Sequence, residues 1–264
     1  MSTTRTHVGL SILAGAPVVL ALLAVGCRGD PPARPPLKVA AAADLAVAFP
    51  ELGALFEAQT GHPVVFSFGS SGLLAQQVGE GGPFDVYASA NVRFVDQVLA
   101  QGRCAADSRV IYGVGRVGIW SRTRAYTLDE LTGPGVVKVA IPDPEHAPYG
   151  MAAQQAVEAH GMWSALKPRL VYGDNARHAL QLAESGNVEA AFVPLALALA
   201  TPGGHFTLID ATQHAPLEQG MVACGDRLPL ARRFIALVMS PEGRALMGRH
   251  GFVLPGEAPA PSVP

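Results

Sequence analysis

The sequence is poor in charged residues, and the few that it has are not clustered. Lys, Arg, Asp and Glu make up 15% of its 264 residues, and the formal net charge is −2. No run of Lys and Arg is dense enough to neutralise a row of phosphates, which argues against nucleic acid or an anionic membrane surface as a partner. Hydrophobic residues make up 49% of the chain, a content that predicts a folded protein.

Cysteine is also scarce, with three residues at Cys27, Cys104 and Cys224. No C-x-x-C pair occurs, so nothing in the sequence supports a zinc site or a thioredoxin-like dithiol. The eight histidines show no metal-ligand spacing and no obvious pairing with a serine. In an oxidising compartment Cys104 and Cys224 would form one disulfide, and two unpaired buried thiols are the alternative.

Two glycine motifs lack the context that their usual functions require. Gly113, Gly115 and Gly118 form a G-x-G-x-x-G, but the sequence continues as a strand and does not open a helix. This excludes the dinucleotide-binding interpretation, which needs a helix at that point. The stretch "FGSSGL" is not the G-x-S-x-G of α/β-hydrolases, because Leu73 occupies the place of the second glycine.

The N-terminus has the features of an export signal. Arg5 precedes a stretch of almost wholly apolar residues, 8–25, and small residues follow, so residues 1–26 are predicted to be removed or processed. A permanent transmembrane anchor is the alternative, although the apolar run is near the lower limit for spanning a bilayer. Cys27 ends a partial lipobox, which would make it a lipidated first residue, and residues 28–37 form a proline-rich tether.

Apolar runs and helical patterns alternate along the rest of the chain. Strand-like runs at 37–43, 63–69 and 84–90 are each followed by a helical pattern, as expected for an α/β unit with a parallel sheet. A second alternating set begins with a strand-like run at 110–121 and predicts a second α/β lobe. A last helix follows at 228–251, and the tail at 255–264 is predicted to be disordered.

Two serines and a glycine lie where the second helix begins. Ser70, Ser71 and Gly72 follow the strand "PVVFSFG" and precede a helical pattern. The amino end of a helix has unpaired N–H groups and a partial positive charge, so these residues could hold an anion without a cation. The alternative is that Ser70 or Ser71 only caps its own helix.

The same kind of junction occurs four times, twice in each half of the chain. The other three lie at 41–44, 143–150 and 172–179, each between a strand and a helix. Ligands in open α/β sheets bind beyond the carboxyl ends of the strands. The sequence therefore predicts four loop corners that face one another across a cleft.

Several blocks in a fixed order resemble the periplasmic molybdate-binding proteins of ABC uptake systems. They include "VAAAADL", "TGHPVVFSFGSSGLLAQQ", "IPDPEHAPYGMAA" and "LVYGDNARHALQLAESGNVEAAFV", and the resemblance covers about residues 38–254. It implies an α/β, two-lobe type II periplasmic binding protein fold with a ligand cleft between the lobes. Lobe 1 would comprise 38–114 and 220–254, and lobe 2 would comprise 115–219.

The resemblance also implies the residues that hold the oxyanion, through neutral hydroxyls and backbone amides. Ser71 matches the family's anion-binding serine, and Asp44 falls where the family has Ser or Asn. Tyr149 and Ala176 fall on the backbone-amide positions of the second lobe. Pro194 stands where some members have a tyrosine, and the Tyr149 hydroxyl is a substitute from the opposite side.

Asp44 departs from the family pattern, because a carboxylate repels a dianion. We expect its side chain to cap the following helix while its amide faces the ligand. A protonated Asp44 that donates a hydrogen bond to the ligand is the alternative.

The sequence thus predicts an extracytoplasmic solute receptor and not an enzyme. It would bind molybdate or tungstate without a cofactor, as a periplasmic monomer whose only membrane contact is a lipid on Cys27. Its partners would be an ABC permease and the cytoplasmic ATPase of that permease. Two alternatives remain: a receptor of the same fold for sulfate or phosphate, and a secreted serine hydrolase in which a histidine lies within reach of Ser71.

Overall fold

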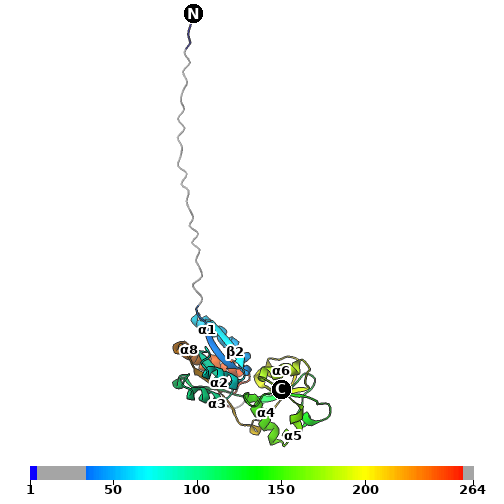
Figure 1. Cartoon of the computed structure of the whole chain (residues 1–264). Helices are drawn as coiled ribbons and strands as arrows, with labels where there is room; N and C mark the ends of the chain where they lie inside the picture. Colours follow the sequence, from blue (N-terminus) through cyan, green and yellow to red (C-terminus); the bar gives the residue numbers. More distant parts are fainter. Residues whose placement is uncertain (5–33, 258–264) are drawn as a thin grey trace. The chain divides into compact units, whose positions relative to one another are not determined.

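The computed structural model describes residues 1–4 and 34–257 (Figure 1). Cys27 and most of the predicted export signal and tether lie outside the described residues. Within the described residues, no helix combines the length and the apolar character that crossing a membrane requires.

The first lobe is built on a five-stranded sheet in the order β2-β1-β3-β10-β4. β1 pairs in parallel with β2 and β3, whereas β10 runs antiparallel between β3 and β4. The strands are β1 (Leu37–Ala42), β2 (Val64–Gly69), β3 (Val86–Ser89), β4 (Val110–Gly115) and β10 (Leu217–Ala223). β1 is buried at five of its six positions, as expected for a parallel strand with both faces covered.

Five helices belong to this lobe, and Figure 1 shows α1, α2, α3 and α8 gathered around the first sheet. They are α1 (Ala48–Thr60), α2 (Ser71–Gly79), α3 (Val92–Ala100), α8 (Leu228–Met239) and α9 (Pro241–Arg249). Phe49 and Phe56 of α1 pack edge-on against Phe234 of α8, and the ring centroids lie 5.8 and 5.4 Å apart. These buried rings join the helices from the two ends of the chain into one core.

The second lobe repeats the same architecture, with strand order β7-β6-β8-β5-β9. Its strands are β5 (Val117–Ser121), β6 (Val139–Pro142), β7 (Leu170–Gly173), β8 (Ala190–Pro194) and β9 (His205–Leu208). Its helices are α4 (Pro148–Ala159), α5 (Trp163–Leu166), α6 (Ala176–Glu184) and α7 (Leu195–Leu199). In each sheet the first strand of the α/β unit, β1 or β6, lies between the second and the third. The next strand across the sheet, β10 or β5, is antiparallel to its neighbour in that unit. The edge strand β9 was not anticipated from the sequence.

The chain passes between the lobes twice, and both passages differ slightly from the predicted boundaries. The predicted strand 110–121 is two strands, because β4 pairs with β10 in the first sheet and β5 pairs with β8 in the second. The predicted boundary between residues 219 and 220 falls inside β10. This strand pairs with β4 from Leu217 onward, so the first lobe resumes there.

Ordered contacts extend beyond the predicted globular range, 38–254, at both ends. Arg34, in the predicted tether, donates a hydrogen bond of 2.6 Å to the carbonyl of Thr60. Arg227 donates one of 2.6 Å to the carbonyl of Pro36. At the other end, Glu257 of the predicted disordered tail pairs with Arg244 at 3.1 Å.

The predicted last helix, 228–251, is two helices, α8 and α9. The break lies at Ser240, whose side chain accepts a hydrogen bond from the amide of Gly243, and Pro241 is the first residue of α9. Proline lacks the amide that would continue α8 and fits the first turn of a new helix.

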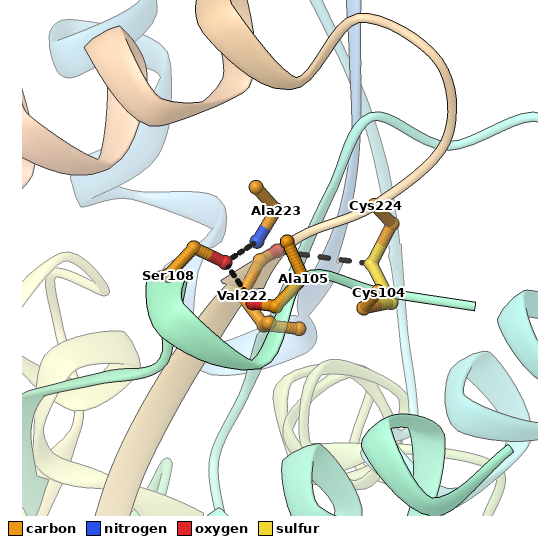
Figure 2. The surroundings of a disulfide bond; sticks show 6 residues. All are labelled: Cys104, Ala105, Ser108, Val222, Ala223 and Cys224. Atoms are coloured by element: carbon orange, nitrogen blue, oxygen red, sulfur yellow. Dashed lines mark hydrogen bonds between the residues drawn. A yellow bond between two sulfur atoms is a disulfide. The ribbon is translucent and has the colours of Figure 1, made fainter. Parts of the chain in front are cut away.

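A disulfide joins Cys104 to Cys224 across a sequence separation of 120 residues (Figure 2). Beside it, Ser108 donates to the carbonyl of Ala105 and accepts from the amide of Ala223. Ala223 pairs with Val86, at the start of β3. The disulfide therefore lies at the amino ends of the parallel strands, the opposite end of the sheet from the four predicted corners.

Candidate functional site

A small cavity lies where the carboxyl ends of the parallel strands meet the starts of the following helices. It is bounded by the amino ends of α2, α4 and α6 and by the short 3-10 helix η1 (Ala43–Ala46). The lining residues are Ala42, Ala43, Asp44, Gly69, Ser70, Ser71, Ala90, Ala147, Pro148, Tyr149, Asn175 and Ala176. The structure thus brings Asp44, Ser71, Tyr149 and Ala176 together, whereas Pro194 is not among the residues that line this cavity.

Three of these residues present backbone amides at helix starts. Ser71 and Ala176 are the first residues of α2 and α6, and Tyr149 is the second residue of α4. An amide at these positions has no partner inside its own helix, and the helix dipole adds partial positive charge there. Asn175 caps α6 through the amides of Arg177 and His178, which leaves the Ala176 amide outside the cap.

The hydroxyl of Ser71 is held by the adjoining strand end and does not cap its helix. Its Oγ accepts a hydrogen bond of 3.0 Å from the amide of Ala90, and its carbonyl accepts one of 2.7 Å from the Tyr87 hydroxyl. A serine hydroxyl that accepts through a lone pair still has its proton to donate. Ser71 is 1% exposed, so this donor is fixed in a dry setting.

Asp44 does not cap a helix, and that expectation is wrong. It lies inside η1, where no side-chain capping bond is formed, and α1 begins four residues later behind Val47. Its Oδ2 accepts hydrogen bonds from the Tyr149 hydroxyl at 2.9 Å and from Gln219 Nε2 at 2.6 Å. Its Oδ1 is buried and has no hydrogen-bond partner among the described residues.

Burial raises the pKa of Asp44 from 3.8 to about 6, because the charged form loses its hydration. The hydrogen bonds from Gln219 and Tyr149, and the nearby amides of Asp44 and Leu45, lower the pKa and offset part of this effect. No cationic side chain lines the cavity to stabilise the charge. The site therefore favours a neutral Asp44 at mildly acid pH.

A buried hydrogen-bond network extends from Asp44 through both lobes. Gln219 Nε2 donates to the Tyr149 oxygen at 2.9 Å, and the Tyr112 hydroxyl donates to Gln219 Oε1 at 2.7 Å. Burial, together with the nearby Asp44 carboxyl, raises the pKa of Tyr149 well above its usual value, so this hydroxyl keeps its proton. That proton is directed to Asp44, so it is not offered to the cavity as the sequence suggested.

The network packs tightly against the passage between the lobes. A methyl group on Gly115 would lie 2.2 Å from the Tyr149 hydroxyl oxygen and 2.7 Å from Gln219 Nε2. Only a residue without a side chain fits there, which explains glycine at the end of β4.

Residues 37–253 match the sequence profile described as bacterial extracellular solute-binding protein. The chain belongs to this family. It is 30% identical to the molybdate-binding protein ModA of Rhodobacter capsulatus over 77% of this chain and 82% of that protein. It is 29% identical to ModA of Azotobacter vinelandii over 83% of this chain and 90% of the relative.

Solved structures agree with this assignment. The periplasmic molybdate-binding protein of Azotobacter vinelandii superposes with a TM-score of 0.78 at 30% identity, covering 83% of this chain and 99% of that one. The sulfate-binding protein SubI of Mycobacterium tuberculosis, at 17% identity and a TM-score of 0.74, covers 84% of this chain and 88% of its own and shares the fold. The predicted two-lobe periplasmic binding protein fold is confirmed.

Several residues of this solute-binding protein site were not singled out from the sequence. Gln219 is fully buried in the middle of β10 and reaches Asp44 across 175 residues of sequence, so no local pattern could identify it. His146 was visible in "DPEHAP" but carried no signal of its own. In the structure its backbone and ring both contact Ser70 from the opposite lobe.

The chemistry that would make this solute-binding protein a serine hydrolase is not assembled at Ser71. The hydrogen bonds of Ser71 go to Ala90 and Tyr87, and no histidine is among its partners in residues 34–257. His146 contacts Ser70 instead, and the Ser70 hydroxyl donates to the His146 carbonyl at 2.6 Å. Nor do the described residues contain a cluster of three or more His, Cys, Asp or Glu that could hold a metal ion.

Proposed function

We propose that this solute-binding protein receives molybdate and tungstate outside the cytoplasm for uptake by an ABC transporter. One observation carries the proposal: uncharged donors from both lobes converge on a cavity that no Lys or Arg lines. The Ser71 hydroxyl and the amides at the starts of α2, α4 and α6 suit a tetrahedral oxyanion that arrives fully coordinated by oxygen. Curated relatives with this overall match are named molybdate-binding proteins, which supports the choice of ligand.

Asp44 enters this proposal as a neutral donor. Its Oδ2 already accepts from Tyr149 and Gln219, so a proton on the carboxyl belongs on Oδ1, the atom without a partner. An O–H at that position adds one hydrogen bond to the oxyanion and removes a charge that would repel it. Binding to the ionised form therefore takes up one proton from solution.

The proposed setting follows from the predicted export signal and from the names of the relatives. A Bacillus subtilis relative, 26% identical over 88% of this chain, is named a putative ABC transporter substrate-binding lipoprotein. We propose that this protein acts in the periplasm as a monomer, delivers its anion to a membrane permease with a cytoplasmic ATPase, and catalyses no reaction. Residues 1–26 as an export signal, and a lipid on Cys27, remain predictions.

The test is calorimetric titration of the purified protein, lacking residues 1–27, with molybdate, tungstate, sulfate and phosphate. Tight binding of the first two and far weaker binding of sulfate is the expected result. The oxygens of sulfate lie closer to its central atom and cannot reach every donor at once. Sulfate or phosphate binding as tightly as molybdate would contradict the size argument and favour a receptor for another oxyanion.

A matched pair of variants locates the site. Ser71→Ala removes the buried hydroxyl donor and should weaken molybdate binding by about tenfold to a hundredfold, as expected for a hydrogen bond to a charged group. Ser67→Ala makes the same change on β2 at an exposed position, outside the cavity, and should leave the affinity unchanged. Equal affinities for the two variants would place the anion elsewhere.

A further inference from the structure

The two lobes touch directly at one edge of the cavity, through Ser70 and Gly72 on one side and His146 on the other. The His146 carbonyl accepts a hydrogen bond of 2.6 Å from the Ser70 hydroxyl and one of 2.9 Å from the Gly72 amide. The ring Nδ1 of His146 lies 2.8 Å from the same Ser70 oxygen. Three hydrogen bonds therefore meet at one point between the lobes.

The hydrogen-bond arithmetic fixes the direction of each contact. Ser70 has a single hydroxyl proton, and the geometry directs it to the carbonyl of His146. The contact with the ring must then run from an N–H at Nδ1 to the Ser70 oxygen. Nε2 points toward Asp143, whose Oδ2 lies 3.6 Å away, too far for a hydrogen bond.

The identities of Ser70 and Gly72 are explained by the contact with the second lobe and not by the needs of α2. Ser70 occupies the capping position of α2 yet makes no capping bond, so its hydroxyl is committed to the opposite lobe. A methyl group on Gly72 would lie 2.8 Å from the Cβ of His146 and 3.0 Å from its carbonyl oxygen. Glycine is required at this point only because the other lobe approaches so closely.

We propose that Ser70, Gly72 and His146 form a latch that holds the lobes closed over the bound oxyanion and sets its rate of release. This inference rests on the proposed function, because the rate of release that the latch would set is that of the proposed oxyanion. Ser70 is 4% exposed, so its hydroxyl is shielded from water, whereas Gly72 and His146 are partly buried. A hydrogen bond from a shielded hydroxyl contributes more to the closed form than one in water. These are positioning residues, distinct from the Ser71 donor, and they act on the lobe that carries the Tyr149 amide.

The structure predicts an order among three variants. His146→Ala keeps the backbone carbonyl and loses only the ring contact, so release should quicken about fivefold. Ser70→Ala loses both contacts of the hydroxyl, and release should quicken about thirtyfold. Gly72→Ala introduces a methyl group that the closed form cannot accommodate, so its release should be at least as fast as that of Ser70→Ala.

The experiment loads each purified protein with radiolabelled molybdate, adds an excess of unlabelled molybdate, and follows the retained label by rapid filtration. Ser67→Ala, at an exposed position of β2, is the matched control and should release label at the wild-type rate. The association rate should change by less than about threefold in every variant, because a closure contact forms after encounter. His146→Asn, which restores a side-chain donor near Nδ1, should recover slow release.

The outcomes separate this inference from the proposed function. If the wild-type protein retains no molybdate, the proposed ligand is wrong, and the latch inferred for that ligand falls with it. If the wild-type protein retains molybdate and Ser70→Ala releases it within twofold of Ser67→Ala, the latch is refuted while the ligand stands. A decrease in the association rate of Ser70→Ala with an unchanged release rate would assign Ser70 to the encounter with the ligand. Unfolding of Ser70→Ala at a lower urea concentration than Ser67→Ala would assign it to folding. Either result would also overturn the proposal.

Discussion

Replacing Asp44 by Asn should stabilise the protein at neutral and alkaline pH and do so progressively less as the pH falls. The carboxyl is 1% exposed, lacks a cationic neighbour in the cavity, and has one oxygen without a partner. Asn is nearly the same size and cannot ionise. Its oxygen can accept from Tyr149 and Gln219 as Oδ2 does, and its NH2 group takes the place of the protonated Oδ1.

The size of the effect follows from the pKa of Asp44, which burial raises from 3.8 to about 6 in the folded protein. An acid whose pKa is higher in the folded state stabilises that state fully below its unfolded pKa. This stabilisation is lost as the pH rises through the folded pKa. A difference of about two units corresponds to about 3 kcal/mol, and most of it disappears between about pH 4 and about pH 8.

The measurement is urea unfolding of the ligand-free wild-type and Asp44→Asn proteins across that pH range. The variant's advantage in the free energy of unfolding should grow by about 2–3 kcal/mol from the acid to the alkaline end. Asp129→Asn is the control, because Asp129 is exposed and its side chain pairs with no other described residue, so this variant should give a curve parallel to wild type. Parallel curves for Asp44→Asn as well would refute the raised pKa and the neutral-donor role derived from it.

The same group links binding to pH. Above about pH 6 the wild-type protein should take up close to one proton for each molybdate bound, measured by calorimetry in buffers of different ionisation enthalpy. Asp44→Asn should take up none, and its affinity should stay level where that of the wild type falls.

Two further predictions concern the framework around the site. Replacing both Cys104 and Cys224 by Ser opens a loop of 120 residues and should lower the free energy of unfolding by about 5 kcal/mol, measured in urea, with molybdate affinity unchanged because the disulfide lies at the far end of the sheet. A loss below about 1 kcal/mol would contradict the chain-entropy argument. Gly115→Ala places a methyl group 2.2 Å from the Tyr149 hydroxyl oxygen and should weaken molybdate binding at least tenfold, whereas Gly113→Ala meets nothing closer than 3.5 Å and should bind normally. Equal binding by the two glycine variants would show that Tyr149 need not hold its position.

The fold was accessible from the sequence because its signals are local and repeated. Each corner of the cavity follows a short apolar strand and precedes a helical pattern, so the corners at 70–72 and 172–179 could be placed without knowing any long-range contact. The choice of Ser71 and Ala176 within those corners came from the family resemblance. The split between α8 and α9 also had a local signal, since Ser240 and Pro241 together form a helix start that the prediction passed over.

The interior of the site was not accessible in the same way. Aspartate at a strand-to-helix junction is a good capping residue locally, yet burial beside Gln219 and Tyr149 decides its conformation. Those partners are 175 and 105 residues away in sequence, and no local pattern predicts that they contact Asp44. The contact of Ser70 with His146 is hidden for the same reason, since it depends on how one lobe meets the other.

The placement of β10 has a consequence for the order in which the two lobes of the chain can fold. All five strands of the second sheet come from one continuous stretch, from β5 at Val117 to β9 at Leu208, so that lobe can fold as soon as it has emerged. The first sheet must wait, because β10 fits between β3 and β4 and follows the whole second lobe in sequence. We expect chains arrested before Leu217 to show a protease-resistant second lobe and a digestible amino-terminal half, and the reverse pattern would contradict this order of assembly.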